Sequence, residues 1–169
     1  GFSMEAISKA LGGSLKPLLD VIVSGKIRGC VGIVGCNNPH IRHDSGHVGL
    51  ARELIKRDIL CVETGCASIA CAKAGLLLPG SIEKAGKGLK EVCGALGIPP
   101  VLHMGSCVDN TRILNLVAAL AQLANVRIDQ LPIGGAAPEW YSPKAVAIAK
   151  YFVGSGVSTV LGISPRIQG

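Results

Sequence analysis

Short apolar runs alternate along the chain with stretches in which apolar residues recur at helical spacing. The runs predict strands at 28–35, 58–63, 99–104, 126–130 and 157–161, the fourth being the weakest. The helical spacing predicts helices over 14–24, 43–57, 67–76, 82–96, 109–124 and 142–153. The segment 131–138, which contains Gly134 and Gly135, is interpreted as a loop between the fourth strand and the last helix.

Strands that alternate with helices predict an α/β fold, a doubly wound (Rossmann-like) parallel sheet with helices on both faces. The chain has 169 residues, the size of one domain, so residues 1–169 are interpreted as a single Rossmann-like domain. Apolar residues make up 49% and charged residues 17%, which excludes a disordered chain. Because the chain opens at Gly1 without an initiator Met, we expect it to be a fragment of a larger multidomain enzyme.

Charge and cysteine usage exclude several classes of partner. The net charge is +6, but the basic residues are scattered, and Lys56-Arg57 is their only adjacent pair. No nucleic-acid interface is therefore predicted, since such a surface shows a basic stripe interleaved with aromatic residues. No apolar run reaches the roughly 18 residues of a membrane span. The odd number of cysteines, seven, and the lack of a secretory signal predict reduced thiols and a cytoplasmic protein.

Three cysteines share one local pattern, in which an apolar strand ends in Gly or Ser, then Cys, ahead of a helix. They are Cys36 after Gly35, Cys66 after Gly65, and Cys107 after Gly105-Ser106. The carboxyl ends of parallel strands meet at one edge of the sheet, and helix N-termini favour thiolate, the form that ligates iron, zinc or nickel. The pattern predicts a metal site at Cys36, Cys66 and Cys107. The alternative, three structural cysteines in the core, stays open at this point.

Lys144 is the candidate catalytic residue. Ser142 fits an N-cap and Pro143 the first helical position, so Lys144 falls in the first turn of the last predicted helix. The helix dipole there disfavours a cation, and we expect it to lower the pKa of Lys144 and to suit it to proton transfer or to polarising an oxygen. A solvated lysine at a helix start is the alternative. Ile148, one turn later, is either an apolar wall of the same pocket or ordinary core.

Other polar and sulfur-containing residues are weaker candidates. His43 and His47 have the i, i+4 spacing of a metal pair but lack a third ligand nearby. Four further cysteines lie within apolar runs or helices and are interpreted as structural: Cys30, Cys61, Cys71 and Cys93. Polar residues that flank the three candidate ligands are interpreted either as hydrogen-bond donors to sulfur or as helix caps: Asn37, Asn38, Ser106, Asp109 and Asn110.

Several longer motifs resemble the catalytic subunit of the anaerobic nickel–iron carbon monoxide dehydrogenases, in the order found in that family. They are Gly35-Cys-Asn-Asn-Pro39, Glu63-Thr-Gly-Cys-Ala67, Ala72-Lys-Ala-Gly-Leu76, His103-Met-Gly-Ser-Cys-Val-Asp-Asn110 and Pro138-Glu-Trp-Tyr-Ser-Pro-Lys-Ala-Val146. The similarity spans most of the chain and corresponds to the C-terminal α/β domain of that subunit.

The resemblance implies a function as well as a fold. Cys36, Cys66 and Cys107 would be three protein ligands of a nickel–iron–sulfur cluster of the Ni-4Fe-4S type, and Lys144 the catalytic lysine beside the substrate. The implied reaction is CO + H₂O ⇌ CO₂ + 2H⁺ + 2e⁻, with electrons leaving through further iron–sulfur clusters, held outside this chain, to a ferredoxin-like acceptor. The implied partners are the remaining domains of the enzyme, a second copy in a homodimer of the full-length protein and, in addition, an acetyl-CoA synthase. The chain by itself is expected to be inactive.

Two other functions are compatible with the sequence. The hybrid-cluster proteins, which are hydroxylamine-type reductases, have similar cysteines at strand ends, and nickel content distinguishes them from the dehydrogenases. A non-catalytic α/β module that retains only the fold is the third alternative. Cluster-binding cysteines upstream in the same gene would count against that module.

Overall fold

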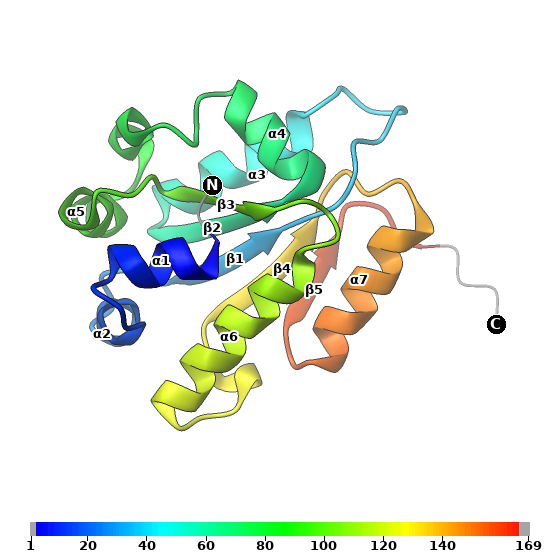
Figure 1. The fold of residues 1–169 in the computed structure, drawn as a ribbon. Coiled ribbons are helices and arrows are strands. Elements are labelled where there is room, and N and C mark those ends of the chain that lie inside the picture. Colours follow the sequence, from blue (N-terminus) through cyan, green and yellow to red (C-terminus); the bar gives the residue numbers. More distant parts are fainter. Residues whose placement is uncertain (1–2, 166–169) are drawn as a thin grey trace.

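The structure, a computed structural model, describes residues 3–165 and has a five-stranded, all-parallel sheet as its centre (Figure 1). The strands are β1 (Gly29–Ile33), β2 (Ile59–Thr64), β3 (Val101–Gly105), β4 (Ile133–Ala137) and β5 (Ser158–Leu161). Their order across the sheet is β3-β2-β1-β4-β5, and every neighbouring pair is parallel. The predicted α/β class is confirmed.

Helices cover both faces of this sheet. They are α1 (Met4–Ala10), α2 (Lys16–Val23), α3 (Ser45–Lys56), α4 (Gly65–Lys73), α5 (Lys87–Leu96), α6 (Asn110–Ala124) and α7 (Pro143–Gly154). In Figure 1, α3 and α4 lie on one face and α1, α6 and α7 on the other. Among residues 3–165, no helix is long and apolar enough to cross a membrane.

The strand order reverses once, and the reversal decides where a site can form. The chain builds outward from β1 through β2 to β3, then returns to place β4 on the other side of β1. In open parallel sheets, ligands bind beyond the carboxyl ends of the strands at such a switch point. Here the switch point lies between β1 and β4.

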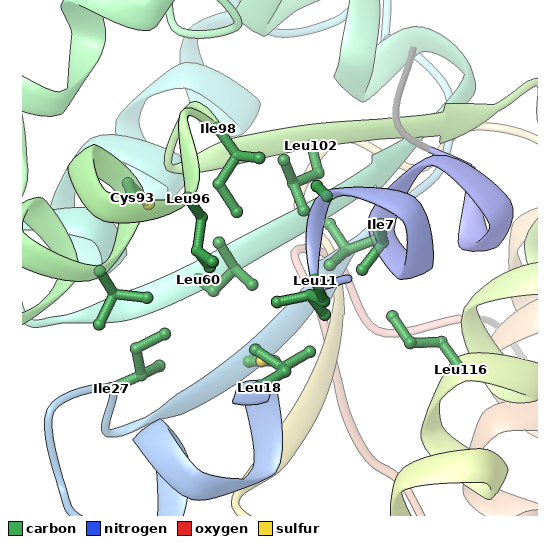
Figure 2. Close-up of a pocket in the computed structure, with 14 residues that line it drawn as sticks. Ile7, Leu11, Leu18, Ile27, Leu60, Cys93, Leu96, Ile98, Leu102 and Leu116 are labelled. Atoms are coloured by element: carbon green, nitrogen blue, oxygen red, sulfur yellow. The ribbon is translucent and has the colours of Figure 1, made fainter. Parts of the chain in front are cut away.

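The core on the α1 and α6 side of the sheet contains a small apolar cavity of about 20 Å³. Figure 2 shows Leu18 of α2, Leu60 of β2, Leu102 of β3 and Leu116 of α6 turned toward it. All of its lining side chains are apolar or cysteine, so a water molecule inside would find no polar side chain to bind. This side of the sheet is therefore structural core.

The strand predicted at 126–130 is wrong, and so is the loop predicted at 131–138. Residues Ile128–Gln130 form the 3-10 helix η2, and β4 lies within the predicted loop. One glycine of β4 is required by packing: a Cβ added at Gly135 would lie 2.8 Å from Cδ2 of Phe152 and 3.0 Å from Oγ1 of Thr159. The bulk that normally marks a strand is supplied here by Phe152 of α7, which the local sequence of β4 does not reveal.

Two helix predictions also need correction. The helix α1 was not predicted, and the helix predicted over 82–96 is divided into the 3-10 helix η1 (Pro79–Lys84) and α5. The start of α5 is set by Asp58, whose Oδ1 accepts a hydrogen bond of 2.8 Å from the Leu89 amide. Asp58 was predicted to begin the second strand, but it has a φ of 60°, and β2 begins one residue later.

Candidate metal centre

The three candidate cysteines lie at the same edge of the sheet, beyond the carboxyl ends of β1, β2 and β3. Cys36 is in the loop after β1, Cys66 is in the first turn of α4 directly after β2, and Cys107 is two residues beyond β3. Cys66 is exposed, while Cys36 and Cys107 are half-buried. The parallel arrangement of the strands therefore places all three thiols at the carboxyl edge of the sheet.

The ammonium group of Lys144 interacts electrostatically with all three candidate cysteines. Its Nζ donates a hydrogen bond of 2.9 Å to Sγ of Cys107. That bond and the Cys107 charge raise the pKa of Lys144, and the charges of Cys36 and Cys66 add to the rise. The lowered pKa expected from the helix dipole is wrong, because the nearby sulfur charges outweigh the field of the first turn of α7.

A glycine allows the loops of Cys66 and Cys107 to approach each other. Gly65 has a φ of +60°, and a Cβ added there would lie 3.1 Å from the Cβ of Cys107. Any side chain at position 65 would push the start of α4 away from the loop after β3. Gly65 is therefore needed for the close approach of the start of α4 to Cys107.

The local pattern predicts that Cys36 lies directly ahead of its own helix, and for this cysteine the prediction is wrong. It precedes α3 by nine residues, and its Sγ instead lies 3.5 Å from Oγ of Ser142, at the start of α7. Burial opposes ionisation of this thiol, but hydrogen bonds from Ser142 and from the backbone of Tyr141, together with the Lys144 charge, lower its pKa overall. The helix N-terminus that favours the Cys36 thiolate thus belongs to a distant part of the sequence.

The two histidines with i, i+4 spacing do not form a metal pair. His43 is exposed and precedes α3, with its Nε2 3.3 Å from Oδ1 of Asp44. His47 is fully buried in α3, and its Nε2 lies 2.9 Å from the carbonyl oxygen of Cys36. One histidine therefore faces solvent and the other supports the backbone of a candidate ligand.

The polar residues that flank the cysteines form hydrogen bonds with the backbone and with other polar side chains. In the described part of the chain, none of these hydrogen bonds goes to a sulfur. Nδ2 of Asn110 donates to the carbonyl oxygen of Cys107 at 2.7 Å, and its Oδ1 accepts from Oγ1 of Thr64 at 2.6 Å. Oδ2 of Asp109 accepts from the backbone and the hydroxyl of Ser106. Asn37 and Asn38 contact the loop after β4. These side chains hold the loops in position rather than cap helices or donate to sulfur.

The remaining cysteines lie inside the domain, as expected, and Ile148 is half-buried against the core. Burial raises the pKa of Cys30 and of Cys93 to about 12.

The sequence patterns did not identify Glu63, which is fully buried in β2 and accepts a hydrogen bond of 3.1 Å from Sγ of Cys71. Burial raises the pKa of Glu63 to about 8. A carboxyl inside an apolar strand that is covered on both faces was the available signal.

The donor set fits a sulfur-ligated metal cluster in kind. Three thiols on converging loops, close to a cation and to helix N-termini, are the soft donors that iron–sulfur and nickel sites use. Among residues 3–165, no three histidine, cysteine, aspartate or glutamate side chains are grouped closely enough to hold a metal ion. The thiols are thus placed at a common edge without forming a closed cage.

The sheet and this edge define a Rossmann-like domain that presents cysteine thiols and a lysine ammonium beyond the carboxyl ends of its strands. Residues 3–169 match the family model for the Prismane/CO dehydrogenase family. The chain belongs to this family, as the sequence motifs predicted.

Similar proteins are carbon monoxide dehydrogenases. Carbon monoxide dehydrogenase 1 of Methanosarcina mazei is 59% identical over 169 residues, which are 100% of this chain and 27% of that protein. The as-isolated, Ni-free carbon monoxide dehydrogenase from Thermococcus sp. AM4, produced without the CooC maturase, superimposes with a TM-score of 0.96 at 59% identity, over 98% of this chain and 26% of that one.

A second similar structure is that of an acetyl-CoA synthase/carbon monoxide dehydrogenase with NiZn[Fe4S4] and NiNi[Fe4S4] clusters in closed and open alpha subunits. Its TM-score is 0.92 at 38% identity, over 96% of this chain and 26% of that one. The chain therefore spans about a quarter of the length of the relatives it matches.

Proposed function

We propose that this chain is the α/β domain of a nickel–iron carbon monoxide dehydrogenase and contributes Cys36, Cys66 and Cys107 as ligands of its active-site cluster. The observation that carries the proposal is the placement of these thiols at the carboxyl edge of the sheet, where Lys144 binds Cys107 and the charges of Cys36 and Cys66 act on it. The proposed reaction is the oxidation of CO with water to CO₂, two protons and two electrons. When bound, the nickel–iron–sulfur cluster supplies Lewis-acid metal ions that lower the pKa of water and a centre that accepts electrons.

Lys144 contributes charge and hydrogen bonds to this reaction. Its exposed side chain ends at Sγ of Cys107, and its pKa is raised, so the ammonium form persists at neutral pH. An ammonium donor at that place stabilises negative charge as it develops on the oxygens of the product. Pro143 and Ser142 set the start of α7 and thereby the direction from which Lys144 approaches Cys107.

The partners proposed for the complete enzyme follow from the exposed carboxyl edge of the sheet, where this chain supplies only part of the cluster ligands. Large apolar side chains around the thiols are exposed, namely Ile69, Val108 and Tyr141, and the rest of the polypeptide would cover them and add the remaining cluster ligands. We further propose a cytoplasmic homodimer that passes electrons to a ferredoxin-like acceptor. Association with an acetyl-CoA synthase is supported by the complex that contains one of the similar structures.

The names of the relatives favour carbon monoxide dehydrogenase over the two alternatives, a hydroxylamine-type reductase and a non-catalytic module. The test is the full-length protein that contains this chain, purified without oxygen. We expect it to hold nickel and iron and to reduce a viologen dye in the presence of CO. Nickel-free protein that reduces hydroxylamine, or folded protein without cluster or activity, would overturn the proposal.

A matched pair of variants tests the ligand assignment. Cys107→Ala removes a candidate ligand, and we expect it to abolish nickel binding and CO-dependent dye reduction. Cys93→Ala removes a thiol that is 1% exposed in α5 and belongs to the apolar core, and we expect it to retain both. Equal nickel content in the two variants would contradict the assignment of Cys107.

A further inference from the structure

Glu139 is a completely buried carboxylate in the loop between β4 and α7. Its Oε1 accepts hydrogen bonds from the backbone amides of Gly46 at 2.6 Å and of His47 at 3.4 Å. Its Oε2 accepts from Nδ2 of Asn37 at 3.1 Å. Every group that forms a hydrogen bond with this carboxylate is an N–H donor, so both carboxylate oxygens are needed as acceptors.

These donors belong to two segments that lie far from Glu139 in the sequence. Gly46 and His47 form the first turn of α3, a helix of 12 residues whose N-terminus favours a negative charge. Asn37 directly follows the candidate ligand Cys36, and its amide also donates to Oδ1 of Asp44. Glu139 therefore links the loop after β4 to the loop after β1 and to the start of α3.

A second set of contacts connects the same segments to Cys36 itself, through its carbonyl oxygen and its thiol. His47 donates through Nε2 to the carbonyl oxygen of Cys36, which requires a proton on Nε2. The thiol of Cys36 meets the backbone of Tyr141 and the side chain of Ser142, two and three residues after Glu139. Lys144 follows in the next positions of the same segment. The carbonyl and the thiol of Cys36 are thus both held by segments that Glu139 joins.

We propose that Glu139 is a positioning residue, which fixes Cys36 relative to Lys144 by joining the loops after β1 and β4 to the start of α3. The inference rests on the proposed function, since it assigns Cys36 to the cluster and Lys144 to the substrate. Glu139 touches neither group and acts through Asn37, His47 and the start of α7.

The structure supplies two independent ways to disturb Glu139. Glu139→Gln keeps the shape but replaces one acceptor oxygen by an amide that faces donors only, so one of its partners loses its hydrogen bond. Gly46→Ala leaves Glu139 itself unchanged, but the added Cβ would lie 2.9 Å from its Cγ and would displace the carboxylate. Gly49→Ala is the matched control, because position 49 lies in the same helix with nothing within 4 Å of an added Cβ.

The experiment compares the full-length enzyme with these three variants by metal analysis, by the electron paramagnetic resonance spectrum of the reduced enzyme and by steady-state CO oxidation. We expect Glu139→Gln and Gly46→Ala to lower kcat about 10- to 100-fold, the usual effect of losing a group that orients a ligand. We also expect both to change the resonance spectrum while the KM for CO and the iron content stay near wild type. Gly49→Ala should match wild type in every measurement.

The Gly46→Ala variant keeps the inference testable even where Glu139→Gln fails to fold, because alanine favours the helix. Wild-type kcat and an unchanged spectrum in Gly46→Ala would overturn the positioning role. A loss of kcat that only follows a loss of metal in both variants would also overturn it, since Glu139 would then serve stability alone. Failure of the proposed function is distinguished separately, by a wild-type enzyme without nickel or CO oxidation.

Discussion

Glu63 makes the stability of this domain depend on pH in a direction unusual for a glutamate. The side chain lies in β2, one of its oxygens accepts the hydrogen bond from Cys71, and the other is buried without a hydrogen-bond partner among the described residues. Burial raises the pKa of Glu63 from 4.5 to about 8. The folded state therefore holds a proton that the unfolded chain releases at neutral pH.

The sign and size of the effect follow from these two values. Below about pH 4.5 the carboxyl is protonated in both states, and its contribution to stability is fully present. Between about pH 4.5 and 8, only the folded state is protonated, so the free energy of unfolding falls by roughly 1.4 kcal/mol for each pH unit. Above about pH 8 the loss is complete and amounts to roughly 4–5 kcal/mol, a large part of the stability of an ordinary domain.

The perturbation is Glu63→Gln, which keeps the shape and the acceptor for Cys71 but cannot ionise. We expect the variant to lose the pH slope, to match wild type within about 1 kcal/mol at pH 5 and to exceed it by roughly 2–4 kcal/mol at pH 8. The assay is urea unfolding of the 169-residue chain, followed by circular dichroism at pH 5, 6, 7 and 8.

Glu53→Gln is the control for this assay. Glu53 is exposed on α3, and the Lys56 side chain that binds it lowers its pKa. The control should retain the wild-type slope between pH 5 and 8. An equal slope in wild type and Glu63→Gln, or a Gln variant less stable than wild type at pH 8, would refute the reasoning.

Three further predictions concern the site and the packing. In the full-length enzyme, Lys144→Ala should lower CO oxidation about 10²- to 10⁴-fold with nickel and iron unchanged, and normal turnover at full metal load would contradict its role. Gly135→Ala should destabilise the chain by roughly 1–3 kcal/mol in urea unfolding, because the added Cβ overlaps Phe152; an unchanged midpoint would show that α7 yields easily. The 169-residue chain alone should fold without stoichiometric nickel and without CO-dependent dye reduction, and metal analysis with a dye assay checks both.

Much of the fold could be predicted because its signals are local. The apolar runs of β1, β2, β3 and β5 and the periodic helices gave the α/β class and the parallel sheet. The exception, β4, consists of Ile, Gly and Ala, and it forms a strand because Phe152 of α7 fills the space above Gly135. Strand preference expresses the fit between neighbours, so a strand whose bulk comes from another element carries no local signal.

For the candidate site, too, the position of the residues could be predicted from local sequence patterns, whereas their electrostatic surroundings could not. Strand–Gly–Cys patterns and the order of the motifs predicted from the sequence alone that Cys36, Cys66 and Cys107 lie at one edge, since parallel strands place their carboxyl ends together. The electrostatic setting of these residues depends on the tertiary structure. The pKa of Lys144 rises instead of falling because Sγ of Cys107 accepts a hydrogen bond from its ammonium group and the charges of Cys107, Cys36 and Cys66 act on it.

The sequence by itself determined the class of fold, the family and which residues are candidates for chemistry, because these depend on residue type and spacing along the chain. Only the tertiary structure decided that Cys36 faces the start of α7, that Glu139 binds the start of α3 and that Glu63 is fully buried. Each of these contacts joins segments distant in sequence or depends on the packing of helices against the sheet. Hydrogen bonds and desolvation act over a few ångströms in space, and the distance along the chain does not reveal which groups will meet.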